Sequence, residues 1–418
     1  MTPCLPLRPF GKSVVWAPTG SDASAFDRMA IIESGVSERS LMESAGRSAA
    51  QILDKVFPKG EITVVVGSGN NGGDGIILGR TLQAWGRKTK MVGVGKHQLD
   101  SGLGNGWPME IGDPEPVFDS SSLIVDAVLG TGMVGKPRKE QSKAIQFINR
   151  SECPVLSLDV PSGLNSDNGK ALGEVISADV TIAFGWPKLG TLLQGGRSQS
   201  GRLIAIEIGF PPPGPASFGA AVVTPEWALE RRPIRKYDSH KNSVGSLLLV
   251  AGQAGMAGAA VLSARGSLRG GLGQLRIVSD KSNRTIIQSA VPEAIFVSSD
   301  DYEEIKYAVS KSDALAIGPG LGCSSQVGCL LEMLCECGGS PPVLLDADGL
   351  NMATAGTGPR IKDWTFERNV LLTPHLGEMA RLSSLSPEFI GSDRLVVTKE
   401  FAEKTGATVL LKGLPSVV

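Results

Sequence analysis

Short apolar runs alternate along the chain with longer amphipathic segments. The runs are rich in Val, Ile and Leu, and most of them end in Gly, Asp, Pro or Ser. They lie at 62–69, 88–95, 122–130, 154–163, 180–188 and 202–209, and again at 246–252, 274–279, 314–320, 342–349, 369–375 and 408–413. Because strands buried on both faces are apolar throughout, this pattern predicts α/β structure with parallel sheets covered by helices on both faces.

A Pro/Gly-rich stretch near the middle of the chain separates two such sets of runs. The segment FPPPGPASFG at 210–219 suits neither a helix nor a central strand, and a polar, basic stretch follows it. We therefore predict an N-terminal Rossmann-like, three-layer αβα domain at 1–214, a linker at 215–240, and a second α/β domain at 241–418.

Composition excludes several classes of partner. The 418 residues carry a formal net charge of -1 and only 5% aromatic residues. A nucleic-acid surface needs a basic excess or stacking aromatics, so we expect no nucleic-acid partner. No apolar run reaches the length of about 18 residues that a membrane span requires, so we expect no membrane partner. The six scattered cysteines and the absence of a secretory signal predict reduced thiols and a cytoplasmic location.

Polar residues gather where the apolar runs end. In an open parallel sheet these carboxyl ends share one edge, and ligands bind there. The polar ends lie at 67–75, 126–136 and 159–163 in the first half, and at 251–260, 318–322, 346–351, 373–378 and 412–416 in the second. Any one of them could be a plain turn, but so many together predict one ligand site in each half.

The sequence GSGNNGGDG at 67–75 is the richest of these ends. We expect Gly72 and Gly73 to allow close approach of backbone N–H groups to a phosphate or to adopt positive φ. A helix predicted to begin near Ile76 would point its positive end at the same spot. A G-x-G-x-x-G spacing is present, but the next strand ends in MVGVGK without the acidic residue of a dinucleotide-binding site.

Three oxygen-bearing side chains at these ends suit a cation. Asn71, Asp126 and Ser162 offer hard oxygen ligands, which favour a weakly hydrated alkali cation over zinc. The alternative for Asn71 and its neighbour Asn70 is that both side chains cap the following helix.

Several of these motifs together resemble a known family. LMESAG, GNNGGDG, DAVLGTG, DVPSGLNSDNG, ADVTIAFGWPKLG and IEIG are similar to the epimerase domain of the bifunctional NAD(P)H-hydrate repair enzymes. GMAGAAVLSARGSLRGGLG, IGPGLG, LLDADGLN, LLTPHLGEMARL and VLLKG resemble the ADP-dependent dehydratase domain of the same proteins, which has a ribokinase-like fold. The resemblance covers about residues 25 to 418.

The resemblance implies repair of damaged nicotinamide cofactors. Hydration of NADH or NADPH gives R and S hydrates, NADHX and NADPHX. The first domain would interconvert these epimers, and the second would remove water from the S form at the expense of ADP, with Mg²⁺. The family also implies a homo-oligomer. Two alternatives remain open: a nucleotide-binding interaction protein without turnover, and a ribokinase-like small-molecule kinase.

Site residues of the first domain follow from the matching motifs. The hydrate would be bound by Asn70, Asn71, Gly72, Gly73, Asp74 and Asp159, and its phosphates by Gly130, Thr131, Gly132, Met133, Val134, Gly135 and Lys136. Potassium would be bound by Asn71, Asp126 and Ser162. Asp159 is the expected catalytic acid/base, because a carboxylate in a cleft can help a hydroxyl leave and return; the alternative is a structural cap of the PSG turn. Lys188 could meet a phosphate, but a lone lysine is more often a solvated surface charge.

Site residues of the second domain follow in the same way. Ala259, Gly322 and His375 would contact the hydrate, and ADP would meet Lys412, Gly413, Leu414, Pro415 and Ser416. Asp346 and Asp348 would face the phosphate and Mg²⁺. The family pattern continues past VLLKG into a G-x-G-D turn, which this sequence does not contain after residue 400. The sequence therefore predicts a C-terminally incomplete dehydratase domain with impaired dehydration.

Overall fold

Two α/β units make up the chain. The computed structural model describes residues 14–95, 102–108, 110–111, 121–133, 135–214, 217–241, 243–337, 341–366 and 368–418. The first unit spans Met1–Arg232 and the second Pro233–Val418. The predicted linker at 215–240 contains a strand and a helix that belong to the first unit, because strand Ala221–Val223 pairs antiparallel with Val14–Trp16.

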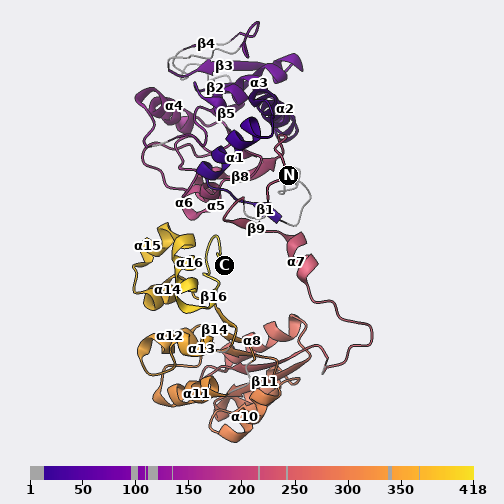
Figure 1. Ribbon diagram of the computed structural model, residues 1–418, viewed down its shortest axis with the longest axis vertical. Helices are drawn as coiled ribbons and strands as arrows, with labels where there is room; N and C mark the ends of the chain where they lie inside the picture. The colour runs from indigo at the N-terminus through magenta and orange to yellow at the C-terminus, as the bar shows by residue number, and fades with distance from the viewer. Residues whose placement is uncertain are drawn as a thin grey trace. The chain divides into compact units, whose positions relative to one another are not determined.

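The first unit is drawn in indigo to magenta in Figure 1. Its strands are β1 Val14–Trp16, β2 Ile62–Val66, β3 Thr89–Gly93, β4 Glu110–Ile111, β5 Leu123–Ala127, β6 Val155–Leu158, β7 Val180–Phe184, β8 Arg202–Ile206 and β9 Ala221–Val223. Its helices are α1 Gly20–Ile32, α2 Glu38–Val56, α3 Asn70–Ala84, α4 Lys139–Arg150, α5 Leu189–Leu192, α6 Gln194–Ser200 and α7 Pro225–Arg231.

A seven-stranded sheet forms the centre of the first unit. Its order is β4-β3-β2-β5-β6-β7-β8 and every pairing is parallel. Because side chains alternate along a strand, Val64 and Val66 pack toward α2 and α3, whereas Val65 packs on the opposite face with Ile145 of α4. Helices thus cover both faces, and the predicted three-layer αβα arrangement is confirmed.

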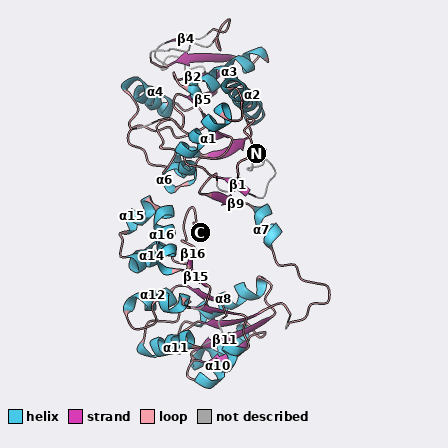
Figure 2. Cartoon of the chain, in the orientation of Figure 1, coloured by secondary structure: helices cyan, strands magenta, loops and turns pink. Residues whose placement is uncertain are grey.

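The second unit, orange to yellow in Figure 1, repeats this plan. Its strands are β10 Ser246–Val250, β11 Gln274–Ser279, β12 Ile295–Ser298, β13 Ala314–Ile317, β14 Val343–Leu345, β15 Val370–Leu372 and β16 Thr408–Val409. Its helices are α8 Ala257–Arg269, η2 Lys281–Asn283, α9 Arg284–Ala290, α10 Tyr302–Ser310, α11 Ser325–Glu336, α12 Asp348–Ala355, α13 Ile361–Thr365, α14 Leu376–Ser383, α15 Pro387–Ser392 and α16 Arg394–Thr405. Figure 2 shows how strands and helices alternate in both units.

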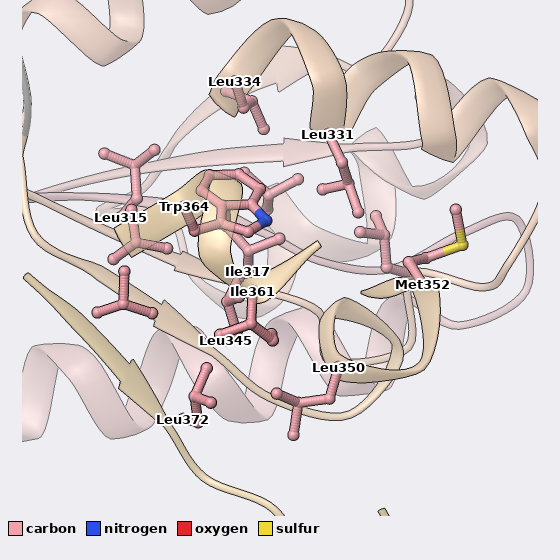
Figure 3. Close-up of a cluster of buried hydrophobic side chains, with 14 of the residues drawn as sticks. Leu315, Ile317, Leu331, Leu334, Leu345, Leu350, Met352, Ile361, Trp364 and Leu372 are labelled. Atoms are coloured by element: carbon pink, nitrogen blue, oxygen red, sulfur yellow. The ribbon is translucent and has the colours of Figure 1, made fainter. Parts of the chain in front are cut away.

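The sheet of the second unit is also seven-stranded and parallel, in the order β12-β11-β10-β13-β14-β15-β16. One face packs around Trp364, which is 1% exposed and surrounded by Leu315, Ile317 and Leu345 among others (Figure 3). Leu249 packs on the other face with residues of α8 and α9.

All twelve predicted strands are present. The sequence pattern missed β1, β4, β9 and β12, which are short. The described cysteines are free thiols. Among the described residues no helix has the length and apolarity needed to cross a membrane.

Candidate functional site

A cavity of about 750 Å³ opens in the first unit at the carboxyl ends of its strands. The chain runs outward from β2 in both directions, to β3 and β4 on one side and from β5 to β8 on the other, so the strand order reverses between β2 and β5. Such a switch point leaves a crevice where ligands bind. Residues after β2, β5, β6 and β7 line the cavity, and helices α1 and α2 supply its other walls.

Helix α3 begins at Asn70, so the predicted start near Ile76 was wrong. The NNGGD motif is the first turn of this helix, and Gly72 and Gly73 have no positive φ. Glycine is needed here for close packing: a Cβ on Gly72 would lie 1.8 Å from the carbonyl oxygen of Gly67, and one on Gly75 would lie 2.5 Å from Cβ of Ala127. The glycines therefore let the helix approach the sheet, and its N-terminus faces the cavity.

Most of the predicted epimerase residues line this one cavity. They are Asn70, Asn71, Asp74, Gly130, Thr131, Gly132, Met133, Lys136 and Asp159. Gly72, Gly73 and Gly135 are not among the lining residues, and Val134 lies outside the described residues. Sequence segments that are far apart thus converge on one site.

Asp159 forms a buried ion pair with Lys188. Nζ of Lys188 donates a hydrogen bond to Oδ1 of Asp159 and another, 2.8 Å long, to the carbonyl oxygen of Phe184. Lys188 is 3% exposed, so its interpretation as a solvated surface charge was wrong. Asp159 has φ +64°, a strained conformation for a residue other than glycine, and such strain clusters at functional sites.

Two further carboxylates of the cavity lie in a desolvated environment. Burial, and then the charge of Asp159, raises the pKa of Asp74 well above its ordinary value. Burial also raises the pKa of Asp27 on α1, with a further contribution from Glu38. Perturbed carboxyl groups that share a cleft with a charged partner are typical of active sites.

The three predicted cation ligands are linked by hydrogen bonds through Leu129. The backbone carbonyl of Leu129 accepts from Nδ2 of Asn71 and from Oγ of Ser162, and Ser162 also donates to Asp126. Asp126 is fully buried and accepts hydrogen bonds from Oγ of Ser162 (2.5 Å), Oγ of Ser157 (2.8 Å) and the backbone N–H of Ser162 (2.9 Å). Burial raises the pKa of Asp126. Nδ2 of Asn71 donates to the carbonyl oxygens of Leu129 and Leu158, whereas its buried Oδ1 has no hydrogen-bond partner.

The orphaned oxygen bears on the two interpretations of Asn71, as a cation ligand or as a helix cap. A buried polar atom without a partner is costly, so it calls for an unseen donor or cation. The N-cap of α3 is Gly69, and Asn70 instead donates to Glu38 over 3.0 Å. The helix-capping alternative for both asparagines was therefore wrong. The oxygen atoms of Asn71, Asp126 and Ser162 fit an alkali cation, because Oδ1 of Asn71 is available to bind one.

Predicted residues of the second unit follow the equivalent sheet edge. The loops after β10 and β13 are joined by hydrogen bonds from the backbone N–H of Gly252 to Pro319 (3.0 Å) and of Gln253 to Gly320 (2.6 Å). A Cβ on Gly320 would lie 2.7 Å from Cβ of Ala259. Gly322, with φ +78°, donates its backbone N–H to Oδ2 of Asp348 over 2.8 Å. Ala259 and Gly322 are thus neighbours at this edge.

A chain of charged groups continues along the edge. Nζ of Lys412 lies 2.7 Å from Oδ1 of Asp346 and 3.9 Å from Oε2 of Glu378. Glu378 accepts the backbone N–H of His375 over 2.7 Å, and Nδ1 of His375 caps α14 by accepting the N–H of Gly377 over 2.9 Å. His375 is therefore structurally engaged through Nδ1, while its side chain stays 56% exposed.

Comparisons with known proteins agree with both halves of this arrangement. The family model described as YjeF-related protein N-terminus matches residues 38–190, and the one described as NAD(P)H-hydrate dehydratase matches 247–418. A bifunctional NAD(P)H-hydrate repair enzyme of Coxiella burnetii is 33% identical over 94% of this chain and 80% of its own. That of Escherichia coli is 31% identical over 92% of this chain and 75% of its own.

The chain belongs to the bifunctional NAD(P)H-hydrate repair enzymes. The relative in Leishmania major is 30% identical over 99% of this chain and 79% of its own. Among solved structures, an ADP/ATP-dependent NAD(P)H-hydrate dehydratase from Bacillus subtilis aligns at 32% identity over 46% of this chain and 66% of its own, with a TM-score of 0.40.

Two residues that line the cavity of this repair enzyme, Asp27 and Lys188, were not recognised from the sequence alone. Asp27 was not singled out, because nothing local marks an aspartate within a helix. One feature of the sequence could have indicated a functional role for Lys188. It follows Pro187 at the end of a predicted strand, where ligands of open α/β sheets bind.

Proposed function

We propose that the first unit epimerises the R and S hydrates of NADH and NADPH in its cavity, and that the second unit dehydrates the S form with ADP. The observation that carries the proposal is the buried Asp159–Lys188 pair in a cavity of about 750 Å³. That volume lies within the usual range for small-molecule sites. Membership of the repair-enzyme family supplies the reaction.

Asp159 is the proton-transfer group at the hydrate ring. Epimerisation requires the hydroxyl on C6 to leave and to return, and a positioned carboxylate assists by exchanging a proton with that oxygen. Lys188 places a positive charge against Oδ1 of Asp159, and the hydrogen bond to Phe184 fixes the lysine. Oδ2 of Asp159 takes no hydrogen bond from the described residues, so it is the oxygen free to meet the hydroxyl.

The phosphates of the hydrate lie against the residues after β5. Thr131, Gly132 and Met133 line the cavity beside the cations of Lys136 and Arg138. Backbone N–H groups and cations together suit a pyrophosphate. The N-terminus of α3 adds its partial positive charge at Asn70 and Asn71.

Potassium would be held by Asn71, Asp126 and Ser162. Oδ1 of Asn71 is the ligand atom without a hydrogen-bond partner, and the Asp126 carboxylate would supply the negative charge. A bound cation would supply fixed positive charge beside the phosphate-binding loop. The residues of the chain position the loop itself, since Ser162 accepts the backbone N–H of Leu129 over 2.8 Å.

In the second unit, Ala259, Gly322 and His375 bind the hydrate, and Lys412–Ser416 meets ADP. The ammonium of Lys412 suits a phosphate. Oδ2 of Asp346 has no hydrogen-bond partner among the described residues, so one carboxylate oxygen is available to Mg²⁺ carried by the nucleotide. The homo-oligomer and the cytoplasmic location stay predictions.

The test of the epimerase is the substitution Asp159→Asn. The amide keeps the shape of the side chain but cannot exchange the proton, so we expect the rate of R-to-S conversion to fall by about 10²-fold or more. Chiral chromatography of the hydrates measures the rate. The matched control is Asp167→Asn, which removes a carboxylate from the same loop outside the cavity lining. Conversion within a few-fold of the parent would contradict the role of Asp159, and no conversion by the parent would favour the binding protein without turnover.

A further inference from the structure

Helix α1 is fastened to the segment that carries Lys188. The backbone N–H of Leu189 donates to the carbonyl oxygen of Pro18 over 2.7 Å, just before the helix begins. Further along α1, Phe26 packs edge-to-face on Trp186 at 5.1 Å between ring centroids. Asp27, the residue after Phe26, is thereby held at the cavity wall close to Lys188.

The carboxylate of Asp27 has no fixed partner in the part of the chain that the structure describes. It lines the cavity and is half-buried, and it makes no hydrogen bond to any described residue. The charged groups that act on it are Glu38 on α2, Lys188 before α5, Asp159 after β6 and Arg28 on its own helix. Burial is the largest cause that raises its pKa, and Lys188 and Arg28 only partly offset it. An unpaired carboxyl group in such surroundings is suited to exchange a proton with a ligand.

Epimerisation by departure and return of a hydroxyl needs two proton transfers. The leaving oxygen must gain a proton, and the water that adds to C6 must lose one. When the two events occur on different faces of the ring, one carboxylate cannot serve both without moving. The single pair Asp159–Lys188 therefore leaves one of the two transfers without a group to perform it.

We propose that Asp27 is the second proton-transfer residue of the epimerase, acting on the hydroxyl that leaves while Asp159 acts on the water that adds. The proposal rests on the proposed function and deepens it by giving the site two acid/base groups from different walls. Asp27 comes from helix α1 and Asp159 from the end of β6.

The C6–O bond breaks with its electron pair on oxygen, which takes the proton of Asp27 and departs as water, while the lone pair on N1 forms the N1=C6 bond. Water then adds to C6 from the other face, the N1=C6 pair returns to N1, and the proton of that water passes to Asp159. Asp27 ends ionised and Asp159 protonated, which is the state that the reverse reaction requires.

The pH dependence of kcat separates this role from a structural one. Because Asp27 must carry a proton and its pKa is raised, the parent rate should fall as pH rises through that pKa. In Asp27→Asn we expect kcat to fall by about 10²-fold or more, with little change in KM, and the high-pH decline to disappear. Asp27→Glu keeps the carboxyl group but displaces it by about one methylene, so we expect a smaller loss of kcat, about tenfold or more, with the decline retained.

The matched control is Asp22→Asn, which removes an exposed carboxylate from the same helix, away from the cavity lining. It should leave kcat and its pH profile unchanged. Thermal unfolding of every variant identifies loss of fold, and if Asp27→Asn does not fold, the Asp27→Glu rate decides. A high-pH decline that persists unchanged in Asp27→Asn, or is lost only in Asp74→Asn, overturns the proposal.

Two substitutions together separate the role of Asp27 from that of Asp159. If Asp159→Asn is slow and Asp27→Asn retains the parent kcat and profile, the epimerase assignment stands and the second group is wrong. If Asp159→Asn also retains the parent rate, the assignment of the catalytic pair is wrong. A raised KM in Asp27→Asn with unchanged kcat would make Asp27 a substrate-binding residue and would overturn its role in proton transfer.

Discussion

The two units share one sheet topology, and in both an aspartate follows directly after the equivalent strand. β6 in the first sheet and β14 in the second hold equivalent positions. Each lies two strands away from the strand of its sheet that comes first in the chain, β2 or β10. Beyond β6, Asp159 adopts φ +64°; beyond β14, Ala347 adopts φ +48° between Asp346 and Asp348. Both units therefore place a strained residue at the same topological point, where ligands of open α/β sheets bind.

The surroundings of these residues differ. The side chain of Lys188, which pairs with Asp159, is 4% exposed, whereas that of Lys412, which pairs with Asp346, is 40% exposed. Helices α1 and α2 precede β2 and wall in the first site. In the described part of the second unit no helix precedes β10. Sheet topology thus fixes where a site lies, and the covering helices decide how strongly its charges are desolvated.

The largest expected effect comes from breaking the buried pair. Lys188→Met leaves the Asp159 carboxylate buried without its cation, and removal of one partner from a buried pair costs about 3–5 kcal/mol. We expect a loss of that size in the unfolding free energy of the first unit, together with loss of epimerisation. Denaturant titration of the full chain, in which the unfolding of the first unit is followed separately from that of the second, measures the change in this free energy.

The matched control applies the same substitution to an exposed pair of the second unit. Lys281 lies 3.2 Å from Asp300, and both side chains are mostly exposed. Exposed ion pairs contribute little, because water and salt screen them, so Lys281→Met should hardly change the unfolding free energy. Equal effects of the two substitutions would show that burial does not distinguish the two units.

Potassium should stabilise only the first unit. A ligand that binds the folded state at 100 times its Kd contributes about 2.7 kcal/mol. We expect a higher melting temperature of the first unit in potassium chloride than in tetramethylammonium chloride at equal ionic strength. Asn71→Ala removes the free oxygen and should abolish the difference. The same melting temperature in both salts for the parent would mean that the asparagine holds no cation.

The smallest expected effect is a pH dependence of opposite sign in the two units. Burial raises the pKa of Asp74 above its unfolded value, so the folded first unit binds the proton more tightly. This contribution to stability is full below about pH 4, the ordinary value, and is lost as pH rises through the folded pKa. Asp74→Asn should flatten the slope.

In the second unit, hydrogen bonds lower carboxyl pKa values. The Ser246 hydroxyl lowers the pKa of Asp313, and the Arg360 guanidinium lowers that of Asp363. Their contributions are present above the ordinary value and are lost as pH falls through the folded pKa. Calorimetry of the full chain should therefore show the first unit losing stability as pH rises above about 4 and the second unit losing stability as pH falls below about 4. Loss of stability on the same side of this pH in both units would contradict the contrast in desolvation.

The sequence by itself determined the strands and the edge at which the sites lie. Strands buried on both faces must be apolar throughout, so an apolar run such as 62–69 or 342–349 predicts a strand without information from the rest of the chain. Polar residues after these runs lie at one edge because parallel strands point the same way. The resemblance then predicted Asp159 and the NNGGD motif as site residues, because both lie in motifs that are similar to those of the family.

Only the tertiary structure decided which charges are buried. Lys188 is buried because its side chain pairs with Asp159 from the neighbouring strand end, and Asp27 lines the cavity because Phe26 packs on Trp186. The helix start at Asn70 likewise depends on the close approach of Gly72 to Gly67. Desolvation and close packing arise between segments that are distant in the chain, and no local pattern encodes them.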